Sequence, residues 1–142
     1  MMDIYLEFLQ KHYILSIIWL FLFISLIITI FKEKLSQVKM VTTDYAVRLI
    51  NDHDAHMIDL RDVIEYKKGH VVNAISYPFS LIKEKKYSDI ENLKDTIVVL
   101  VCNNGMTSYQ AGNMLVAEGF NDVYVVSGGI PEIKAKNIPL IT

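Results

Sequence analysis

The longest hydrophobic stretch of the chain lies near its N-terminus. It runs from Tyr13 to Phe31, nineteen residues without a charged side chain. As a helix it would span about 28 Å, at roughly 1.5 Å per residue, which is close to the hydrocarbon thickness of a bilayer. The stretch is apolar on all sides, so a helix lying on the membrane surface is disfavoured. We predict a transmembrane helix over 13–31 after a short N-terminal segment, residues 1–12.

A cleaved signal peptide is the main alternative for this stretch. The preceding segment is not basic, because Asp3 and Glu7 offset Lys11, and the following KEKLSQ offers no small-residue cleavage site. Both features favour an uncleaved anchor through Tyr13–Phe31. Three lysines follow the stretch and one precedes it, so the positive-inside rule predicts an external N-terminus and a cytoplasmic C-terminal part. We assign residues 32–39 to a basic juxtamembrane linker and residues 40–142 to a separate domain.

From Val38 onward, short apolar runs alternate with segments of helical periodicity. The apolar runs predict strands, and apolar residues spaced three and four apart predict helices. Strands are predicted at 38–42, 56–60, 71–78, 96–102 and 122–129. Helices are predicted at 42–52, 62–69 and 107–119, with a polar helix-and-loop region over 79–92 and a last helical or turn segment through 136. This alternation is typical of an α/β domain with a parallel sheet and helices on both faces.

Two of these predictions depend on single residues. Either Thr42 or Thr43 is expected to cap the first helix of the domain, and Gly69 is expected to end the second. The run that ends at Cys102 is apolar on both faces, as expected for the central strand of a parallel sheet. In open parallel sheets, sites form beyond the carboxyl ends of the strands. Cys102 lies at such an end, as do Asp59, Arg61 and the glycine pair at 128–129.

Charge and cysteine content narrow the classes of function. The net charge of -2 at pH 7 provides no general attraction to nucleic acid, so we expect no nucleic-acid partner. Because the chain has one cysteine, it can form neither an intrachain disulfide nor a cysteine-based zinc cluster. We expect no metal and no cofactor. A lone cysteine is also typical of a reducing compartment, in agreement with the cytoplasmic placement.

Cys102 lies where the central strand ends and a helix is about to begin. A loop of this kind directs backbone N–H groups and the positive end of the helix dipole toward its centre. A thiolate held there is a usable nucleophile, and a persulfide would be held in the same way. Gly105 is expected to take a positive φ and let the loop curl around the sulfur. The alternative, a cysteine that simply fills the core, stays open at this point.

Two segments of the domain resemble the rhodanese-like domain family. The segment MIDLRDVIEYKKGHVVNAISYP is similar to a characteristic family segment with Asp-x-Arg, Glu-Tyr, Gly-His, Ala and Pro. The matching residues are Asp59, Arg61, Glu65, Tyr66, Gly69, His70, Ala74 and Pro78. The segment VVLVCNNGMTSYQAGNMLVAEGFNDVYVVSGGI resembles the family's active-site loop, helix and closing strand with paired glycines. The anchor and the sequence after it also resemble the YibN-type, single-pass rhodanese-like proteins of bacterial inner membranes.

The resemblance implies a rhodanese-like three-layer domain and a sulfurtransferase activity. Cys102 would take sulfane sulfur from a donor such as thiosulfate, become a persulfide, and pass the sulfur to an acceptor. The loop from Cys102 to Thr107 has the length typical of sulfurtransferases, whereas relatives that act on phosphate or arsenate use a longer loop. The substrate-binding residues would be Asn103, Asn104, Gly105, Met106, Thr107 and Ser108, with Asp59 and Arg61 as supporting residues.

The loop departs from the family pattern in one respect. Active members usually carry an arginine or another cation late in the loop, where this chain has Met106, Thr107 and Ser108. Anion binding would then rest on backbone amides and a hydroxyl group, and the loss of one charge-assisted contact costs about 1.5–3 kcal/mol. Two hypotheses therefore stand. One is a membrane-anchored sulfurtransferase, and the other is a non-catalytic rhodanese-like module that binds a membrane or membrane-associated protein partner.

Overall fold

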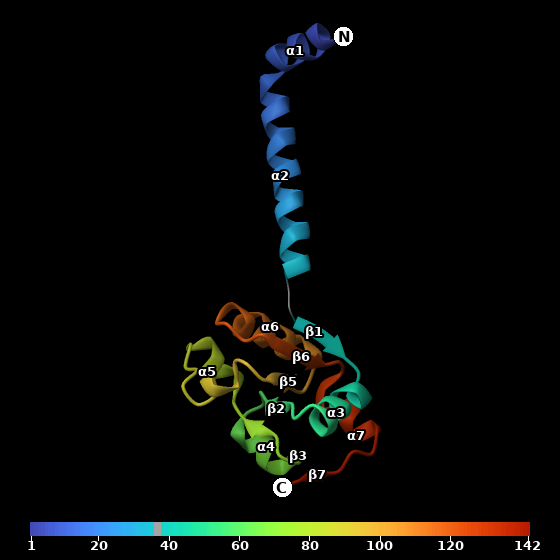
Figure 1. Cartoon of the computed structure of the whole chain (residues 1–142), viewed down its shortest axis with the longest axis vertical. Helices are drawn as coiled ribbons and strands as arrows, with labels where there is room; N and C mark the ends of the chain where they lie inside the picture. The colour runs from blue at the N-terminus through green and yellow to red at the C-terminus, as the bar shows by residue number, and fades with distance from the viewer. Residues whose placement is uncertain (36–37) are drawn as a thin grey trace. The chain divides into compact units, whose positions relative to one another are not determined.

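The chain consists of two compact units, residues 1–36 and 37–142 (Figure 1). A computed structural model describes residues 1–35 and 38–142. The N-terminal unit contains helices α1 (Met2–Lys11) and α2 (Tyr13–Leu35). Among the described residues, α2 is the one helix long and apolar enough to cross a membrane, and its apolar part is Tyr13–Phe31, as the sequence predicts.

The boundaries of the predicted linker differ from the observed elements. The sequence assigned residues 32–39 to the linker, but α2 continues to Leu35 and the first strand of the domain begins at Val38. The residues after Phe31 are Lys, Glu, Lys and Leu, all of which favour a helix, so nothing in this stretch ends α2. The other two residues of the predicted linker lie outside the described part of the chain.

The C-terminal unit is built on a parallel sheet. Among the described residues the sheet has five strands in the order β1-β6-β5-β2-β4, and every neighbouring pair is parallel. The strands are β1 (Val38–Val41), β2 (His56–Asp59), β4 (Ile75–Ser76), β5 (Ile97–Val101) and β6 (Asp122–Val126). The strand before Cys102 is therefore the central one, as its apolar sequence indicates.

Helices cover both faces of this sheet. They are α3 (Thr43–Asp52), α4 (Val63–Lys68), α5 (Phe79–Lys83), α6 (Gly105–Ala117) and α7 (Gly129–Ala135), with a short 3-10 turn at Glu91–Leu93. Figure 1 shows α5 and α6 on one side of the sheet and α3 and α7 on the other. The predicted α/β class, with a parallel sheet between two helix layers, is confirmed.

The two core clusters follow the alternation of side chains along β5. Val98 and Leu100 pack in the cluster that includes Leu115 of α6, whereas Val99 and Val101 pack in the cluster that includes residues of α3 and α7. All four valine and leucine side chains of β5 are completely buried. A strand buried on both faces needs apolar residues at every position, which explains the uninterrupted run before Cys102.

The predicted strand over 71–78 is wrong. The structure has two short strands there, β3 (His70–Val71) and β4, which belong to different sheets. Asn73 has a φ of 61°, and the Ala74 N–H donates to the Val71 carbonyl at 3.0 Å, so the chain turns between them. Strand β3 pairs in an antiparallel manner with β7 (Leu140–Ile141), which the sequence pattern did not predict.

The structure also gives the boundaries of several elements more precisely than the sequence predicts them. The side chain of Thr42, not Thr43, caps α3 by accepting the Tyr45 N–H at 3.3 Å. Helix α6 begins at Gly105, earlier than the predicted start at residue 107. Strand β6 ends at Val126, and Gly129 already belongs to α7. The earlier start of α6 and the earlier end of β6 both change the surroundings of Cys102.

Candidate functional site

Cys102 directly follows the central strand β5 and lies at its carboxyl end. Its side chain is 4% exposed and belongs to the core cluster on the α6 side of the sheet. The next two residues, Asn103 and Asn104, are exposed, and α6 starts immediately after them. The cysteine is therefore buried, but only a short surface turn separates it from the N-terminus of a helix.

The thiol of Cys102 makes its hydrogen bond to an oxygen atom. Its S–H donates to the backbone carbonyl of Asn104, and the Asn104 side-chain Oδ1 lies 3.9 Å from the sulfur. A carbonyl oxygen accepts a hydrogen bond from a thiol but has no hydrogen to donate to a thiolate. In the described part of the chain, the hydrogen-bonding contacts of the sulfur are thus with oxygen acceptors. The turn must rearrange before N–H groups can surround the sulfur.

Asn104 is the N-cap of α6. Its backbone is extended (φ -139°, ψ 145°), and its Oδ1 accepts the backbone N–H of Thr107 at 3.4 Å. The Thr107 hydroxyl lies 3.5 Å from the same oxygen. This cap uses the N–H of Thr107, one of the free groups at the helix start. It leaves the N–H groups of Gly105 and Met106, the two residues before Thr107, for an anion.

The expected positive φ at Gly105 is wrong. Gly105 is the first helical residue of α6, and the glycines with positive φ are Gly69, Gly119, Gly128 and Gly129. The sequence placed the loop over Cys102–Thr107, whereas in the structure the connection between β5 and α6 consists of residues 102–104. Gly105, Met106, Thr107 and Ser108 form the first turn of the helix.

The glycine pair after β6 packs against the backbone of the cysteine turn. Gly128 and Gly129 have φ values of 79° and 64°, and a Cβ atom on Gly129 would lie 2.2 Å from the carbonyl oxygen of Cys102. That oxygen accepts the Ile130 N–H at 2.9 Å. The close approach requires glycine at 129. The sequence placed this pair at a strand end but did not identify it as part of the site.

The first turn of α6 presents different side chains to the core and to the surface. Ser108 is completely buried, and its hydroxyl has no hydrogen-bond partner among the described residues. Thr107 is half-buried, whereas Met106 is 81% exposed. Met106 also lines an open hollow of about 450 Å³ with Met40, Gly105, Tyr109 and Gly128. This hollow adjoins the cysteine turn and is mostly apolar.

Asp59 and Arg61 form a buried ion pair at the end of the neighbouring strand β2. The Arg61 Nη2 lies 2.7 Å from Asp59 Oδ2, and its Nε and backbone N–H donate to the same carboxylate at 3.0 Å. Nη2 also donates to the Gly69 carbonyl at 2.7 Å. These contacts hold the chain after β2 against the end of α4. In these contacts, the Arg61 guanidinium donates hydrogen bonds to carboxylate and carbonyl groups of the protein itself.

Tyr66 and His70 of the family-like segment also hold this region together. The Tyr66 hydroxyl donates to the Ala74 carbonyl at 2.6 Å, and its ring stacks on the His70 ring with centroids 3.8 Å apart. His70 Nδ1 lies 3.0 Å from the Tyr66 carbonyl. Burial raises the pKa of Tyr66, and the negative charge of Asp59 adds to this shift. Both rings therefore serve packing and hydrogen bonding between α4, β3 and the turn before β4.

A family model described as the rhodanese-like domain matches residues 42–136. The chain belongs to the rhodanese-like domain family, which confirms the resemblance of its two segments. It is 36% identical over 136 residues to the protein YibN of Escherichia coli K12, and this alignment covers 96% of the chain and 95% of YibN. A tRNA uridine(34) hydroxylase of Hamiltonella defensa is 36% identical over 99 residues, covering 65% of the chain but 28% of the hydroxylase.

Solved structures of rhodanese-type proteins share this fold. A rhodanese-related protein from Thermoplasma volcanium has a TM-score of 0.61 at 25% identity, covering 72% of this chain and 97% of its own. A human single-domain sulfurtransferase has a TM-score of 0.60 at 18% identity, covering 68% of this chain and 96% of its own. The second likeness shows the fold alone.

Proposed function

We propose that this chain is a membrane-anchored sulfurtransferase that carries sulfane sulfur as a persulfide on Cys102. The observation that carries the proposal is the position of Cys102, at the carboxyl end of the central strand and just before the N-terminus of α6. Membership of the rhodanese-like family supports it. The anchor is α2, with the N-terminus outside and the domain in the cytoplasm.

The reaction has two steps. The thiolate of Cys102 attacks the outer sulfur of a donor such as thiosulfate, and sulfite leaves with the electron pair of the broken S–S bond. A nucleophilic acceptor then attacks the outer sulfur of the persulfide, and Cys102 leaves as a thiolate. Because the chain has one cysteine, a thiol acceptor must belong to another molecule. An acceptor in or near the membrane explains why the domain is tethered.

The negative charge of the persulfide is stabilised by the start of α6. The helix terminus carries about half a positive elementary charge, and its first N–H groups can donate to an anion. Ser108 provides one more donor in this first turn, since its buried hydroxyl has no partner among the described residues. The same contacts can hold the sulfonate oxygens of thiosulfate while the S–S bond breaks. No arginine in the loop contributes.

Sulfur transfer requires the cysteine turn to open. Cys102 is 4% exposed, and its hydrogen bond to the Asn104 carbonyl holds the thiol inside. Rotation of the exposed residues 103 and 104 would break this bond and turn the sulfur toward solvent. The adjoining hollow at Met40, Met106 and Tyr109 then offers an apolar surface on which an acceptor docks.

Turnover with cyanide tests this proposal. Cyanide accepts sulfane sulfur and becomes thiocyanate, so the full chain in detergent should convert thiosulfate and cyanide to sulfite and thiocyanate. Cys102→Ser should abolish the conversion, and Ser108→Ala should slow it without unfolding the domain. An unchanged rate in the Cys102→Ser variant would overturn the proposal, as would an inactive but folded wild-type chain at millimolar donor.

A non-catalytic module is the second candidate, and two observations favour it. The thiol is buried against a carbonyl oxygen, and the loop lacks the cation that active family members usually carry. In this case the domain binds a membrane or membrane-associated protein, and α2 keeps it at that partner. Cys102→Ser would then leave the cellular role intact, whereas deletion of residues 13–31 would abolish it. A role lost with the thiol alone would rule this candidate out.

A further inference from the structure

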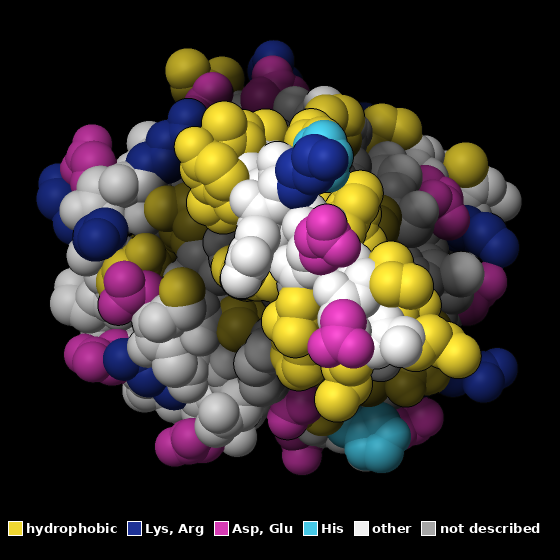
Figure 2. All heavy atoms as spheres, turned by 90° about the horizontal axis from the view of Figure 1, so that it is seen from above, with side chains coloured by type: hydrophobic (Ala, Val, Ile, Leu, Met, Phe, Trp, Pro, Cys, Tyr) yellow, Lys and Arg dark blue, Asp and Glu magenta, His cyan; other side chains and the backbone are white. Residues whose placement is uncertain are grey.

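Helix α1 has a polar side and an apolar side. Its charged residues Asp3, Glu7 and Lys11 follow one another at four-residue spacing and therefore share one face. Ile4, Tyr5 and Phe8 lie on another part of the helix surface and are 69%, 65% and 59% exposed. Figure 2, which views the molecule from its α1 end, shows hydrophobic side chains gathered there with a few charged ones among them. The apolar side of α1 is thus largely open.

A break at His12 separates α1 from α2. His12 has a non-helical backbone (φ -126°, ψ 40°), and its N–H closes α1 by donating to the Phe8 carbonyl at 3.0 Å. Its own carbonyl accepts both the N–H and the hydroxyl of Ser16, at 3.1 and 3.2 Å, and so begins α2. Figure 1 shows α1 turned away from the axis of α2 at this point. The last carbonyl groups of α1 lose the helical partners that a continuous helix would provide.

This break fixes the level of α1 in a membrane. A backbone carbonyl without a partner costs several kcal/mol in hydrocarbon, so a helix break lies where water or lipid headgroups can reach it. The nineteen-residue apolar part of α2, Tyr13–Phe31, begins directly after the break and is long enough to fill the hydrocarbon. Helix α1 therefore lies at the height of the headgroups, where an apolar side can enter the acyl chains.

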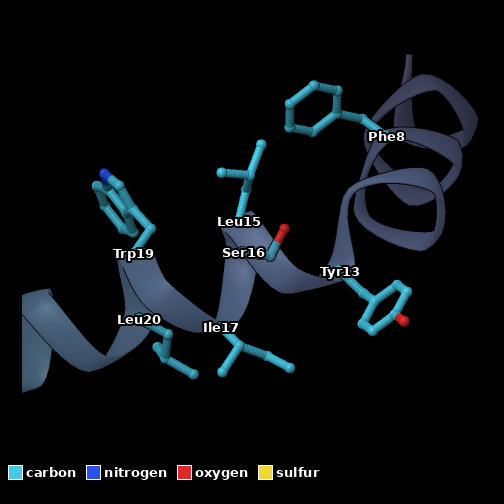
Figure 3. A pocket seen from close by; sticks show the side chains of 7 residues that line it. All are labelled: Phe8, Tyr13, Leu15, Ser16, Ile17, Trp19 and Leu20. Carbon is cyan, nitrogen blue, oxygen red and sulfur yellow. The ribbon is translucent and has the colours of Figure 1, made fainter.

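Side chains around the bend line an open, mostly apolar hollow of about 770 Å³. Figure 3 shows Phe8, Leu15 and Trp19 projecting to one side of the bend, and Tyr13, Ile17 and Leu20 to the other. Tyrosine and tryptophan are the side chains preferred at the boundary between hydrocarbon and water. The polar group of Ser16 is already bonded to His12, so it does not require water in this space. An acyl chain suits such a lining.

We propose that α1 is an interfacial helix that lies in the outer leaflet of the membrane, with its apolar side toward the acyl chains and phospholipid filling the bend. The inference rests on the proposed anchor α2 and on its proposed orientation, with the N-terminus outside. Phospholipid, rather than a protein, is the occupant because the apolar side continues into the apolar span after one residue. Because α1 carries the carboxylates of Asp3 and Glu7 and the single cation of Lys11, apolar contact drives the binding and anionic headgroups are not needed.

Site-directed spin labelling of the full chain in phosphatidylcholine vesicles tests the inference. The background carries Cys102→Ser, and single cysteines replace Tyr5 on the apolar side of α1, Glu7 on its polar side, or Leu22 in the span. Electron paramagnetic resonance then compares the access of oxygen, which concentrates in lipid, with that of a water-soluble nickel chelate. The labels at 5 and 22 should be accessible to oxygen and shielded from nickel, and the label at 7 should show the opposite.

The outcomes separate this inference from the anchor. If the nickel chelate reached the labels at 5 and 7 equally well while residue 22 stayed in lipid, α1 would lie in water. That result would overturn the inference but leave the anchor standing. A label at 5 that neither reagent reaches would mean a protein contact and would overturn it as well. Nickel access at 22 would remove the anchor itself, and with it the membrane part of the proposed function.

Discussion

Replacing Gly129 by alanine should disturb the turn that carries Cys102. The φ of 64° at this residue lies in the left-handed region, where a Cβ atom costs about 1–2 kcal/mol. The new Cβ would also lie 2.2 Å from the Cys102 carbonyl oxygen and 2.9 Å from the Asn103 carbonyl carbon. Both neighbours are backbone atoms and cannot rotate away, so we add the usual cost of overpacking, about 1–3 kcal/mol.

Gly119→Ala is the matched control. Gly119 also has a positive φ, 99°, but a Cβ atom there would meet nothing within 4 Å. This variant therefore loses about 1–2 kcal/mol through backbone strain alone. The difference between the two variants, about 1–3 kcal/mol, measures the contact between the glycine turn and the cysteine turn.

Urea unfolding of residues 37–142, the compact unit, measures both variants. For a urea m value of about 1–3 kcal/mol per molar, the two midpoints should differ by on the order of 1 M. Because the cysteine turn must shift, alkylation of Cys102 by iodoacetamide should also be faster in Gly129→Ala than in Gly119→Ala. Equal midpoints and equal alkylation rates would refute the reasoning, because the Gly129 turn would then not support the site.

Three further changes test other parts of the account. Thr107→Arg supplies the missing cation. Persulfide formation with thiosulfate should therefore accelerate about ten- to hundredfold, which corresponds to about 1.5–3 kcal/mol of charge-assisted binding. Gln110→Arg, one turn away, serves as the control, and equal acceleration by both variants would contradict a local effect. Arg61→Ala leaves a buried carboxylate without its partner and should lower the unfolding free energy by about 3–5 kcal/mol. Lys136→Ala, in an exposed pair, should change it far less. Burial raises the pKa of Tyr77. Folding therefore favours the protonated form of Tyr77. Its contribution to stability is present below the ordinary tyrosine pKa of about 10 and should be lost as the pH rises beyond that value. Tyr77→Phe should reduce this loss of stability at alkaline pH, measured as the urea midpoint against pH.

Most of the fold was predictable because its strands and helices have local signals. Strand β5 is apolar at every position because helices cover both faces of the sheet, and α3 has a threonine cap followed by apolar residues at helical spacing. The division of 71–78 into β3 and β4 was not predictable in this way. The turn depends on Asn73 in a left-handed conformation, and β3 gains its pairing from Leu140 and Ile141, far away in the sequence.

The candidate site shows the same limit. The position of Cys102 at a strand end follows from the pattern, but the partner of its thiol depends on the backbone angles of the two residues after it. Asparagine is a preferred N-cap, so Asn104 offered a signal for the start of α6 that the predicted start at residue 107 overlooked. The contact between Gly129 and Cys102 requires β6 to lie beside β5, and strand order is not encoded in any local pattern.

The central claim is that the start of α6 can hold a sulfur anion at Cys102 without an arginine. Intact mass spectrometry of residues 37–142 after treatment with millimolar thiosulfate, and removal of the donor, tests this claim most directly. The account predicts a gain of one sulfur atom that a reductant reverses and that Cys102→Ser prevents. A folded domain whose mass is unchanged, although its thiol can be alkylated, would contradict it.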